Sequence, residues 1–237
     1  FIFSIVISNS LFSQVLETTP PPYIKTVQFF GSTEFPGTPI VKLGDPITIS
    51  FDDLIGDEAD YYYTIEHYDF DWTPSNLAKN EYMEGFDDMR ILTYLNSYNT
   101  LQMYSHYTLS IPNRNTRRLK KSGNYMLKVF NSDKELVFSR KFMVYEDIAI
   151  VKVEIRRSRD LKYIDEKQVV YFSIDGSDRI IFKNPDQNLK TLIIQNNNLK
   201  NSIYNLKPQY SLGNEFIYRY DQEASFWGGN EYLEFDN

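Results

Sequence analysis

Carboxylates are the most abundant reactive groups in this sequence, and they gather in one stretch. Between Asp45 and Asp88 there are thirteen Asp and Glu residues but a single Lys or Arg, Lys79. Carboxylate oxygens are the ligands that calcium prefers in proteins. Two sets would suit such a site: Asp52, Asp53, Asp57 and Glu58, or Asp69 with Asp71.

A calcium site is only one of three interpretations of this acidic stretch. The sequence lacks the Asp-x-Asp-x-Asp-Gly spacing of an EF-hand loop. The same carboxylates could form solvated loops that keep the domain soluble, or an electronegative surface for a basic partner. The three interpretations stay open, and we predict neither a bound metal nor a cofactor.

Hydrolytic chemistry would need paired carboxylates or a histidine relay. In a strand, Asp69 and Asp71 would point the same way, roughly 6.6–6.8 Å apart, and with Glu66 they could resemble a glycosidase pair. Any alternating acidic pair has that separation. His67 and His106, the two histidines, could meet across strands, but there is no Gly-x-Ser-x-Gly motif and no cysteine. We therefore predict no catalytic residues and no enzyme.

Basic and aromatic clusters are better candidates for contact with another protein. A compact basic loop contains Arg114, Arg117, Arg118, Lys120 and Lys121; it could contact lipid headgroups or an acidic protein, or pair with acidic loops of its own domain. Phe226 and Trp227 precede two glycines in a polar setting. Exposed, they would anchor an interface; buried, they would fill a core. We predict a partner interface at Trp72, Arg117, Arg118, Phe226 and Trp227.

Two aromatic blocks, residues 60–72 and 122–130, predict the elements that hold these side chains. Both alternate bulky and polar residues, as half-buried strands do. Ile47, Ile49 and Phe51 share one face by the same spacing. We expect a long strand over 61–72, a helical turn capped by Ser75, a strand over 100–111 interrupted at His106, and a hairpin around residues 131–134.

The fold class predicted is all-β: an immunoglobulin-like β-sandwich of seven strands, followed by the start of a second β domain. The sandwich spans 23–146 and the incomplete second domain 147–237. In the second segment we expect strands at 148–156, 168–174, 190–195 and 215–220, separated by turn-rich stretches that include three asparagines at 196–198.

Bulk composition restricts the function classes. The chain has 19 Tyr and 17 Phe, no Cys, and a net charge of −7, which argues against nucleic acid as a partner. Residues 1–13 look like the end of a secretory signal, with a linker over 14–22; the alternative is a buried strand. We expect a periplasmic protein that does not itself span a membrane, and a fragment cut within its second domain.

Several longer segments carry a family resemblance: residues 43–63, 69–77, 104–107, 122–130 and 218–232. Together they resemble the plug protein of the type IX secretion system. That resemblance implies a non-enzymatic periplasmic protein, associated with the outer membrane, which binds the translocon barrel and seals its pore. It implies no cofactor and no small-molecule substrate. The alternative is a periplasmic carbohydrate- or peptide-binding module in which Trp72, Trp227 and the acidic loops form the ligand platform.

Overall fold

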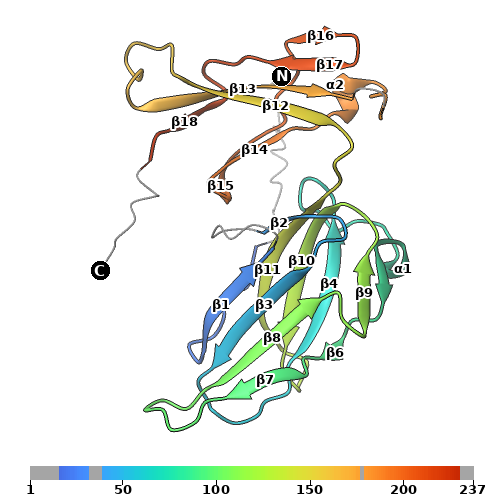
Figure 1. Cartoon of the computed structure of the whole chain (residues 1–237), viewed down its shortest axis with the longest axis vertical. Coiled ribbons are helices and arrows are strands. Elements are labelled where there is room, and N and C mark those ends of the chain that lie inside the picture. The colour runs from blue at the N-terminus through green and yellow to red at the C-terminus, as the bar shows by residue number, and fades with distance from the viewer. Residues whose placement is uncertain (1–15, 32–38, 177–178, 230–237) are drawn as a thin grey trace, which may run out of the picture. The chain divides into compact units, whose positions relative to one another are not determined.

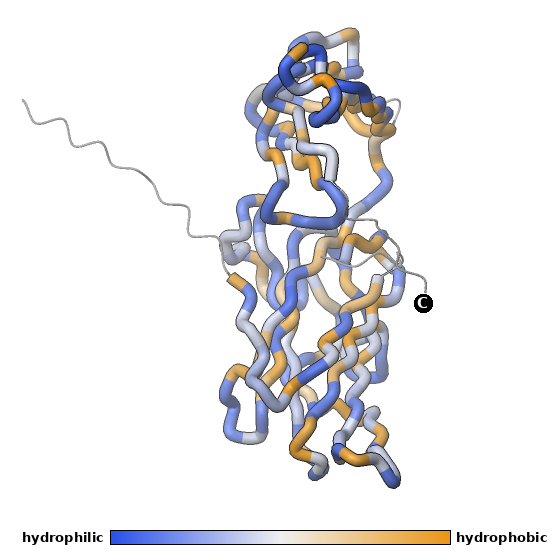
Figure 2. The backbone as a smooth tube through the Cα atoms, turned by 90° about the vertical axis from the view of Figure 1, so that its left-hand side faces the viewer, coloured by the Kyte–Doolittle hydropathy of each residue, from blue (hydrophilic) through white to orange (hydrophobic). Residues whose placement is uncertain are grey.

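The computed structural model describes residues 16–31, 39–176 and 179–229, and the predicted all-β class is confirmed (Figure 1). Helix is confined, in this described part, to two segments of four residues, α1 (Lys79–Tyr82) and α2 (Pro185–Asn188). Figure 2 shows polar and apolar stretches interspersed along the backbone of the described residues. Burial alternates with a period of two along residues 62–67 and 105–111, as a strand with one buried face requires.

The chain divides into two compact units, residues 1–28 with 49–142, and residues 29–48 with 143–237. The sheets of the sandwich use strands from β1 to β11, and a further set of sheets uses strands from β12 to β18. The signal expected over 1–13 lies outside the described residues.

The sandwich has two antiparallel-rich sheets. The first sheet has the order β1-β3-β8-β7: β1 (Ile24–Phe30), β3 (Ile47–Asp53), β8 (Ser105–Ile111) and β7 (Thr93–Asn96). The second has the order β2-β11-β10-β4-β6: β2 (Ile40–Lys42), β11 (Leu136–Tyr145), β10 (Gly123–Phe130), β4 (Tyr62–Tyr68) and β6 (Met89–Arg90). A small separate ladder pairs β5 (Met83–Gly85) with β9 (Thr116–Leu119).

Aromatic rings fill the space between the two sandwich sheets. Phe51 of β3 stacks on Tyr107 with ring centroids 5.2 Å apart, and meets Phe138 of the other sheet edge to face at 5.2 Å. Ile47, Ile49 and Phe51 are all buried, as their spacing predicts. The core is therefore built from flat, rigid side chains, whose burial and ring geometry both favour the folded state.

Several local expectations are corrected. The strand expected over 61–72 ends at Tyr68, because the chain turns there: the Trp72 amide donates to the Asp69 carbonyl at 2.9 Å. β8 runs unbroken through His106 but begins at Ser105 rather than at 100. The helical turn begins after Ala78. In the described residues the two sandwich sheets contain nine strands rather than seven, and β5 and β9 form a further ladder of two. The hairpin around 131–134 is confirmed, with β10 beside β11.

Within the second unit, strands between residues 150 and 227 form a twisted sheet with the path β12-β13-β17-β16, on which β18 also pairs with β13. Its strands are β12 (Ile150–Arg157), β13 (Lys167–Asp175), β17 (Glu215–Tyr218), β16 (Tyr210–Leu212) and β18 (Ser225–Trp227). A separate hairpin joins β14 (Leu192–Gln195) and β15 (Asn198–Tyr204). It turns at Asn196 and Asn197, both with φ of 53°, the left-handed pair that tight hairpins use.

The second unit contains more strands than the sequence pattern suggests. The four expected strands correspond to β12, β13, β14 and β17, while β15, β16 and β18 were not anticipated. Phe172, Phe216 and Tyr218 form its buried cluster, with the rings of Phe172 and Tyr218 stacked at 4.2 Å. β12 lies at the sheet edge, and every residue along it is exposed.

Candidate functional site

Strand β18 separates the two aromatic residues that the sequence places side by side. Phe226 pairs with Gln168 of β13 and is 7% exposed, whereas Trp227 pairs with Lys167 and is 56% exposed. Neighbouring side chains on a strand point to opposite faces, so one ring is buried and the other faces outward. Of the two interpretations of this pair, the buried one is correct for Phe226 and the exposed one for Trp227.

The exposed Trp227 ring lies in a small aromatic and cationic cluster. Tyr163 meets it edge to face with centroids 5.4 Å apart, and the Lys167 ammonium lies 4.4 Å from its centroid. The backbone is fixed as well, because Gln195 Nε2 donates to the Trp227 carbonyl at 2.9 Å and the Gly228 amide donates to the Glu166 carbonyl at 2.8 Å. A rigid, half-exposed Trp is a suitable anchor for a protein interface.

Trp72 belongs to the sandwich core. Its side chain is 1% exposed, its backbone has a φ of 63°, and the Lys141 ammonium lies 4.2 Å from its ring. Asn124 Nδ2 holds the turn before it by donating to the carbonyls of Asp69 and Phe70. The indole therefore offers no surface to a ligand, contrary to what the ligand-platform alternative requires. Its contact with a protein partner stays a prediction, and could only be made through the backbone.

Arg117 and Arg118 lie in β9, and both side chains are largely exposed. Arg118 Nε contacts Glu84 Oε2 at 2.7 Å, and Arg117 contacts the other oxygen of the same carboxylate at 3.7 Å. Exposed ion pairs of this kind contribute at most about 1 kcal/mol. Both guanidinium groups therefore stay available, at little cost, to an acidic surface on a partner.

The acidic stretch is held by hydrogen bonds within the domain. Asp53 is buried and accepts from the Tyr61 hydroxyl at 2.8 Å and the Ile55 amide at 2.9 Å, while Asp52 contacts His106 Nδ1 at 2.6 Å. Hydrogen bonds from Tyr94, then Asn96, lower the pKa of Glu58. Among the residues described, no three Asp, Glu or His side chains are grouped as metal ligands.

The carboxylates considered for hydrolysis are not arranged on one strand face. Glu66 lies in β4 and accepts from the Tyr68 hydroxyl and the Lys128 ammonium, at 2.8 and 2.7 Å. Asp69 and Asp71 follow the end of β4, and Asp71 accepts from the amide and hydroxyl of Thr73. The alternating geometry expected for this pair is therefore wrong, because the chain has already turned.

The two histidines have separate partners and lie in different sheets. His67 Nε2 donates to the Ser122 carbonyl at 3.2 Å, which leaves Nδ1 to accept from the Ser75 hydroxyl at 2.8 Å. His106 in β8 pairs with Asp52. The meeting across strands that the sequence allows does not occur, because β4 and β8 are not neighbours. His67 has the environment of a structural side chain that ties two turns together.

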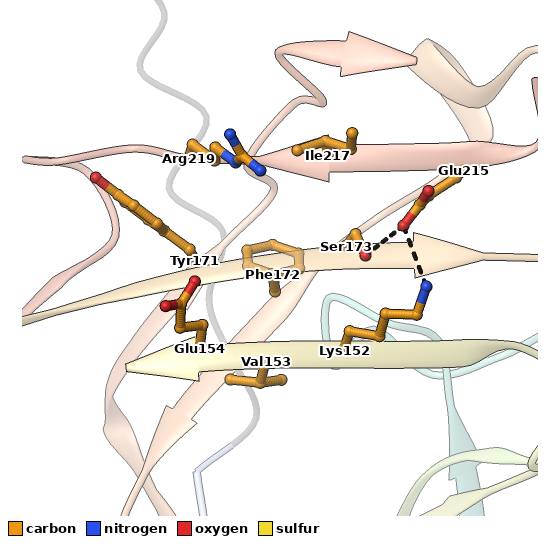
Figure 3. Close-up of a pocket in the computed structure, with 9 residues that line it drawn as sticks. All are labelled: Lys152, Val153, Glu154, Tyr171, Phe172, Ser173, Glu215, Ile217 and Arg219. Carbon is orange, nitrogen blue, oxygen red and sulfur yellow. Dashed lines mark hydrogen bonds and ion pairs between the residues drawn. The ribbon is translucent and has the colours of Figure 1, made fainter. Parts of the chain in front are cut away.

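A hollow on the polar face of the sheet formed by β12, β13 and β17 is a feature that the sequence reasoning missed (Figure 3). There Glu215 Oε1 accepts from the Ser173 hydroxyl at 2.8 Å and lies 3.6 Å from the Lys152 ammonium. Tyr171 donates to Asp221, and this hydrogen bond raises the pKa of Tyr171. The alternation of polar and apolar residues along 150–157 is the sequence signal that could have predicted this polar face. The charges that line the hollow are largely paired, which suits a surface more than a reaction centre.

Comparisons with known proteins identify the sandwich. The first domain of the type 9 secretion system plug protein family matches residues 24–146, more than half of the chain. The chain belongs to this family. The plug-protein resemblance of the sequence is thereby confirmed. No curated protein matches the chain.

A solved structure extends the likeness beyond the first plug domain. The crystal structure of a hypothetical protein from Parabacteroides merdae matches with a TM-score of 0.84 and 31% sequence identity, over 92% of this chain and 56% of that one. This chain therefore spans little more than half of that relative's length. None of the helices in the described residues is long and apolar enough to cross a membrane.

Proposed function

We propose that this protein is a non-enzymatic periplasmic plug, which binds the outer-membrane translocon barrel of the type IX secretion system and seals its pore. The observation that carries the proposal is the plug-domain match over residues 24–146. A wide pore in the outer membrane leaks unless something closes it. A folded domain that binds the barrel reversibly can close it without any covalent chemistry.

The sandwich has the mechanical properties that a stopper needs. Phe51, Tyr61 and Tyr107 form a mutually packed ring cluster, with centroids 4.9–5.2 Å apart. Close-packed interiors have low compressibility and transmit strain rather than absorb it. A domain built this way keeps its shape under a load at the pore, and its surface residues remain available for contact.

The binding claim is tested by co-purification. Full-length tagged protein is recovered from detergent-solubilised outer membranes of a strain that lacks secreted cargo, and we expect a very large barrel protein to be enriched with it. A tagged periplasmic β-sandwich of similar size and charge serves as the control. Absence of the barrel from the wild-type sample would contradict the proposal.

The sealing claim needs a separate measurement. Deletion of the gene should make the outer membrane permeable to vancomycin, a large antibiotic that intact outer membranes exclude, and the wild-type gene should restore exclusion. Unchanged permeability in the deletion strain, with the barrel still present, would mean that the protein binds without sealing.

A further inference from the structure

One segment of the sandwich has the composition of an interface core rather than of an exposed hairpin. Residues 91–113 contain no Asp, Glu, Lys or Arg over 23 positions, in a chain that is 24% charged. They form β7, β8 and the connection over 97–104. Depletion of charge, with enrichment of aromatic residues and Met, distinguishes the centre of protein interfaces from the rest of a surface.

Apolar side chains of this hairpin are nonetheless exposed. Its connection projects past the strand ends of the sandwich (Figure 1). Single exposed apolar residues are ordinary, but here they are concentrated. We call the following residues the apolar tip: Ile55, Leu95, Tyr98, Leu101 and Met103, with exposures of 61%, 73%, 93%, 111% and 49%.

The loop that carries the tip is held in place by hydrogen bonds. The Ser97 amide donates to the Tyr104 carbonyl at 2.8 Å, and the Tyr104 amide donates to the Ser97 hydroxyl at 2.9 Å. Gln102 Nε2 reaches the Leu54 carbonyl of the neighbouring loop at 3.0 Å. Because the loop is already ordered, binding loses less conformational entropy.

The neighbouring loop lies directly against the tip. A Cβ added at Gly56 would come within 2.7 Å of the Met103 Cβ, so the two backbones meet where Gly56 has no side chain. Ile55, next to Gly56, therefore belongs to the same surface. The tip therefore combines the end of β7 with two loops that are far apart in sequence and meet at Gly56 and Met103.

A negative rim borders the tip and defines what can bind there. Glu58 accepts from the Tyr94 hydroxyl at 2.7 Å and from Asn96 Nδ2 at 3.0 Å, so β7 holds this carboxylate beside the tip. Asp57, next to it, is exposed. Anionic lipid headgroups would be repelled by these carboxylates, and the hairpin has no Lys or Arg to attract them. A protein pocket with basic residues at its edge would be complementary.

We propose that the apolar tip inserts into an apolar pocket, rimmed by Lys or Arg, on the protein that this chain plugs. We take the protein with this pocket to be the translocon barrel, and this assignment rests on the proposed function. The tip then supplies the buried anchors, and Asp57 and Glu58 orient the complex. Hot-spot residues of interfaces are enriched in Tyr, the type of Tyr98, and cluster near the centre of the interface among contacts that exclude water.

The test compares two identical substitutions in the full-length protein. Leu101→Asp places a charge in the tip, while Leu161→Asp changes a leucine that is 86% exposed in a turn of the second unit. Affinity for the purified barrel in detergent should fall at least tenfold with Leu101→Asp and stay unchanged with Leu161→Asp, while both keep the wild-type melting temperature. Glu58→Lys should also weaken binding, and increasingly so at low salt.

The outcomes distinguish the tip from the function on which it rests. If wild-type protein binds the barrel and Leu101→Asp binds equally well, the tip proposal is wrong and the plug function stands. If wild-type protein does not bind the barrel, the proposed plug function is wrong. Cross-linking then tests separately whether the apolar tip contacts a protein. Benzoylphenylalanine at position 101, but not at position 161, should then join an identified protein at an apolar site flanked by Lys or Arg. No adduct at 101, or Leu101-dependent binding to anionic lipid vesicles, would overturn the tip proposal.

Discussion

Gly123 lies against the Nε2 edge of the His67 ring, so closely that a Cβ added at Gly123 would come within 2.3 Å of His67 Nε2. Its φ of +146° is also one that residues with a side chain rarely adopt. His67 in turn connects the turn at Ser122 with the turn at Ser75 through its two ring nitrogens. The missing side chain of one residue therefore allows the other to join two loops.

Gly123→Ala should destabilise the sandwich by about 2–4 kcal/mol, because the added methyl group overpacks the ring and the backbone is strained. Urea unfolding followed by circular dichroism measures the change. Gly44→Ala is the matched control, since Gly44 also has a positive φ, of +100°, but a Cβ added there would meet no other atom within 4 Å. It should cost only about 1 kcal/mol for the backbone. Equal losses in the two variants would mean that the His67 contact contributes nothing.

The two tryptophans should report on opposite environments. A Trp227→Phe variant keeps only Trp72, which is 1% exposed, and a Trp72→Phe variant keeps only Trp227, which is 56% exposed. We expect blue-shifted emission and little quenching by acrylamide in the first variant, and the reverse in the second. Unfolding in urea should erase the difference. Strong quenching of Trp72 in the folded protein would contradict its position in the core.

Much of the fold follows from local pattern. The alternation of Ile47, Ile49 and Phe51 predicts their shared buried face, and the asparagines at 196 and 197 predict a turn. Both depend only on neighbouring residues and on the geometry of a strand or a turn. The all-β class and the plug-family resemblance follow from the sequence for the same reason, because they repeat over many positions.

Long-range contacts explain what the sequence alone left out. The end of β4 at Tyr68 depends on a distant residue. The Asn124 side chain donates a hydrogen bond to the carbonyl of Asp69, which is 55 residues away in the sequence. That bond turns the chain and directs Trp72 inward, so no local pattern could place its indole. The apolar tip had a sequence signal, the absence of charge over residues 91–113, but its exposure depends on how two loops meet.

Buried tyrosines should make the protein lose stability in alkali. Burial is the main cause that raises the pKa of Tyr61, and its hydrogen bond to Asp53 is the second. Burial also raises the pKa of Tyr125, and it raises the pKa of Tyr82 to about 12. The unfolded chain ionises these groups near their ordinary pKa of 10, while the folded state keeps them neutral. Their stabilising effect is complete below that pH and is lost as the pH rises towards the folded values.

The free energy of unfolding should therefore be flat near pH 8–9 and fall above about pH 10. Urea unfolding over a pH series measures it, with tyrosinate absorbance recorded in parallel. Tyr125→Phe removes one of these groups together with its 2.7 Å hydrogen bond to the Lys121 carbonyl. It should cost about 1 kcal/mol at neutral pH and make the alkaline loss shallower. A stability that stays constant into strong alkali would show that these hydroxyls ionise in the folded state.

The pair Phe226 and Trp227 allows stability and binding to be separated within one strand. Phe226→Ala removes a ring that is 7% exposed and should destabilise the second unit by about 3–5 kcal/mol. Trp227→Ala removes an outward ring whose edge-to-face contact with Tyr163 is worth only about 1 kcal/mol. Thermal unfolding of the full-length protein measures both. If Trp227 contacts the partner, as the sequence analysis predicts, its substitution should weaken binding to the barrel at an almost unchanged melting temperature. A Trp227→Ala protein that is as unstable as Phe226→Ala would instead assign the indole to the packing of β18 on β13.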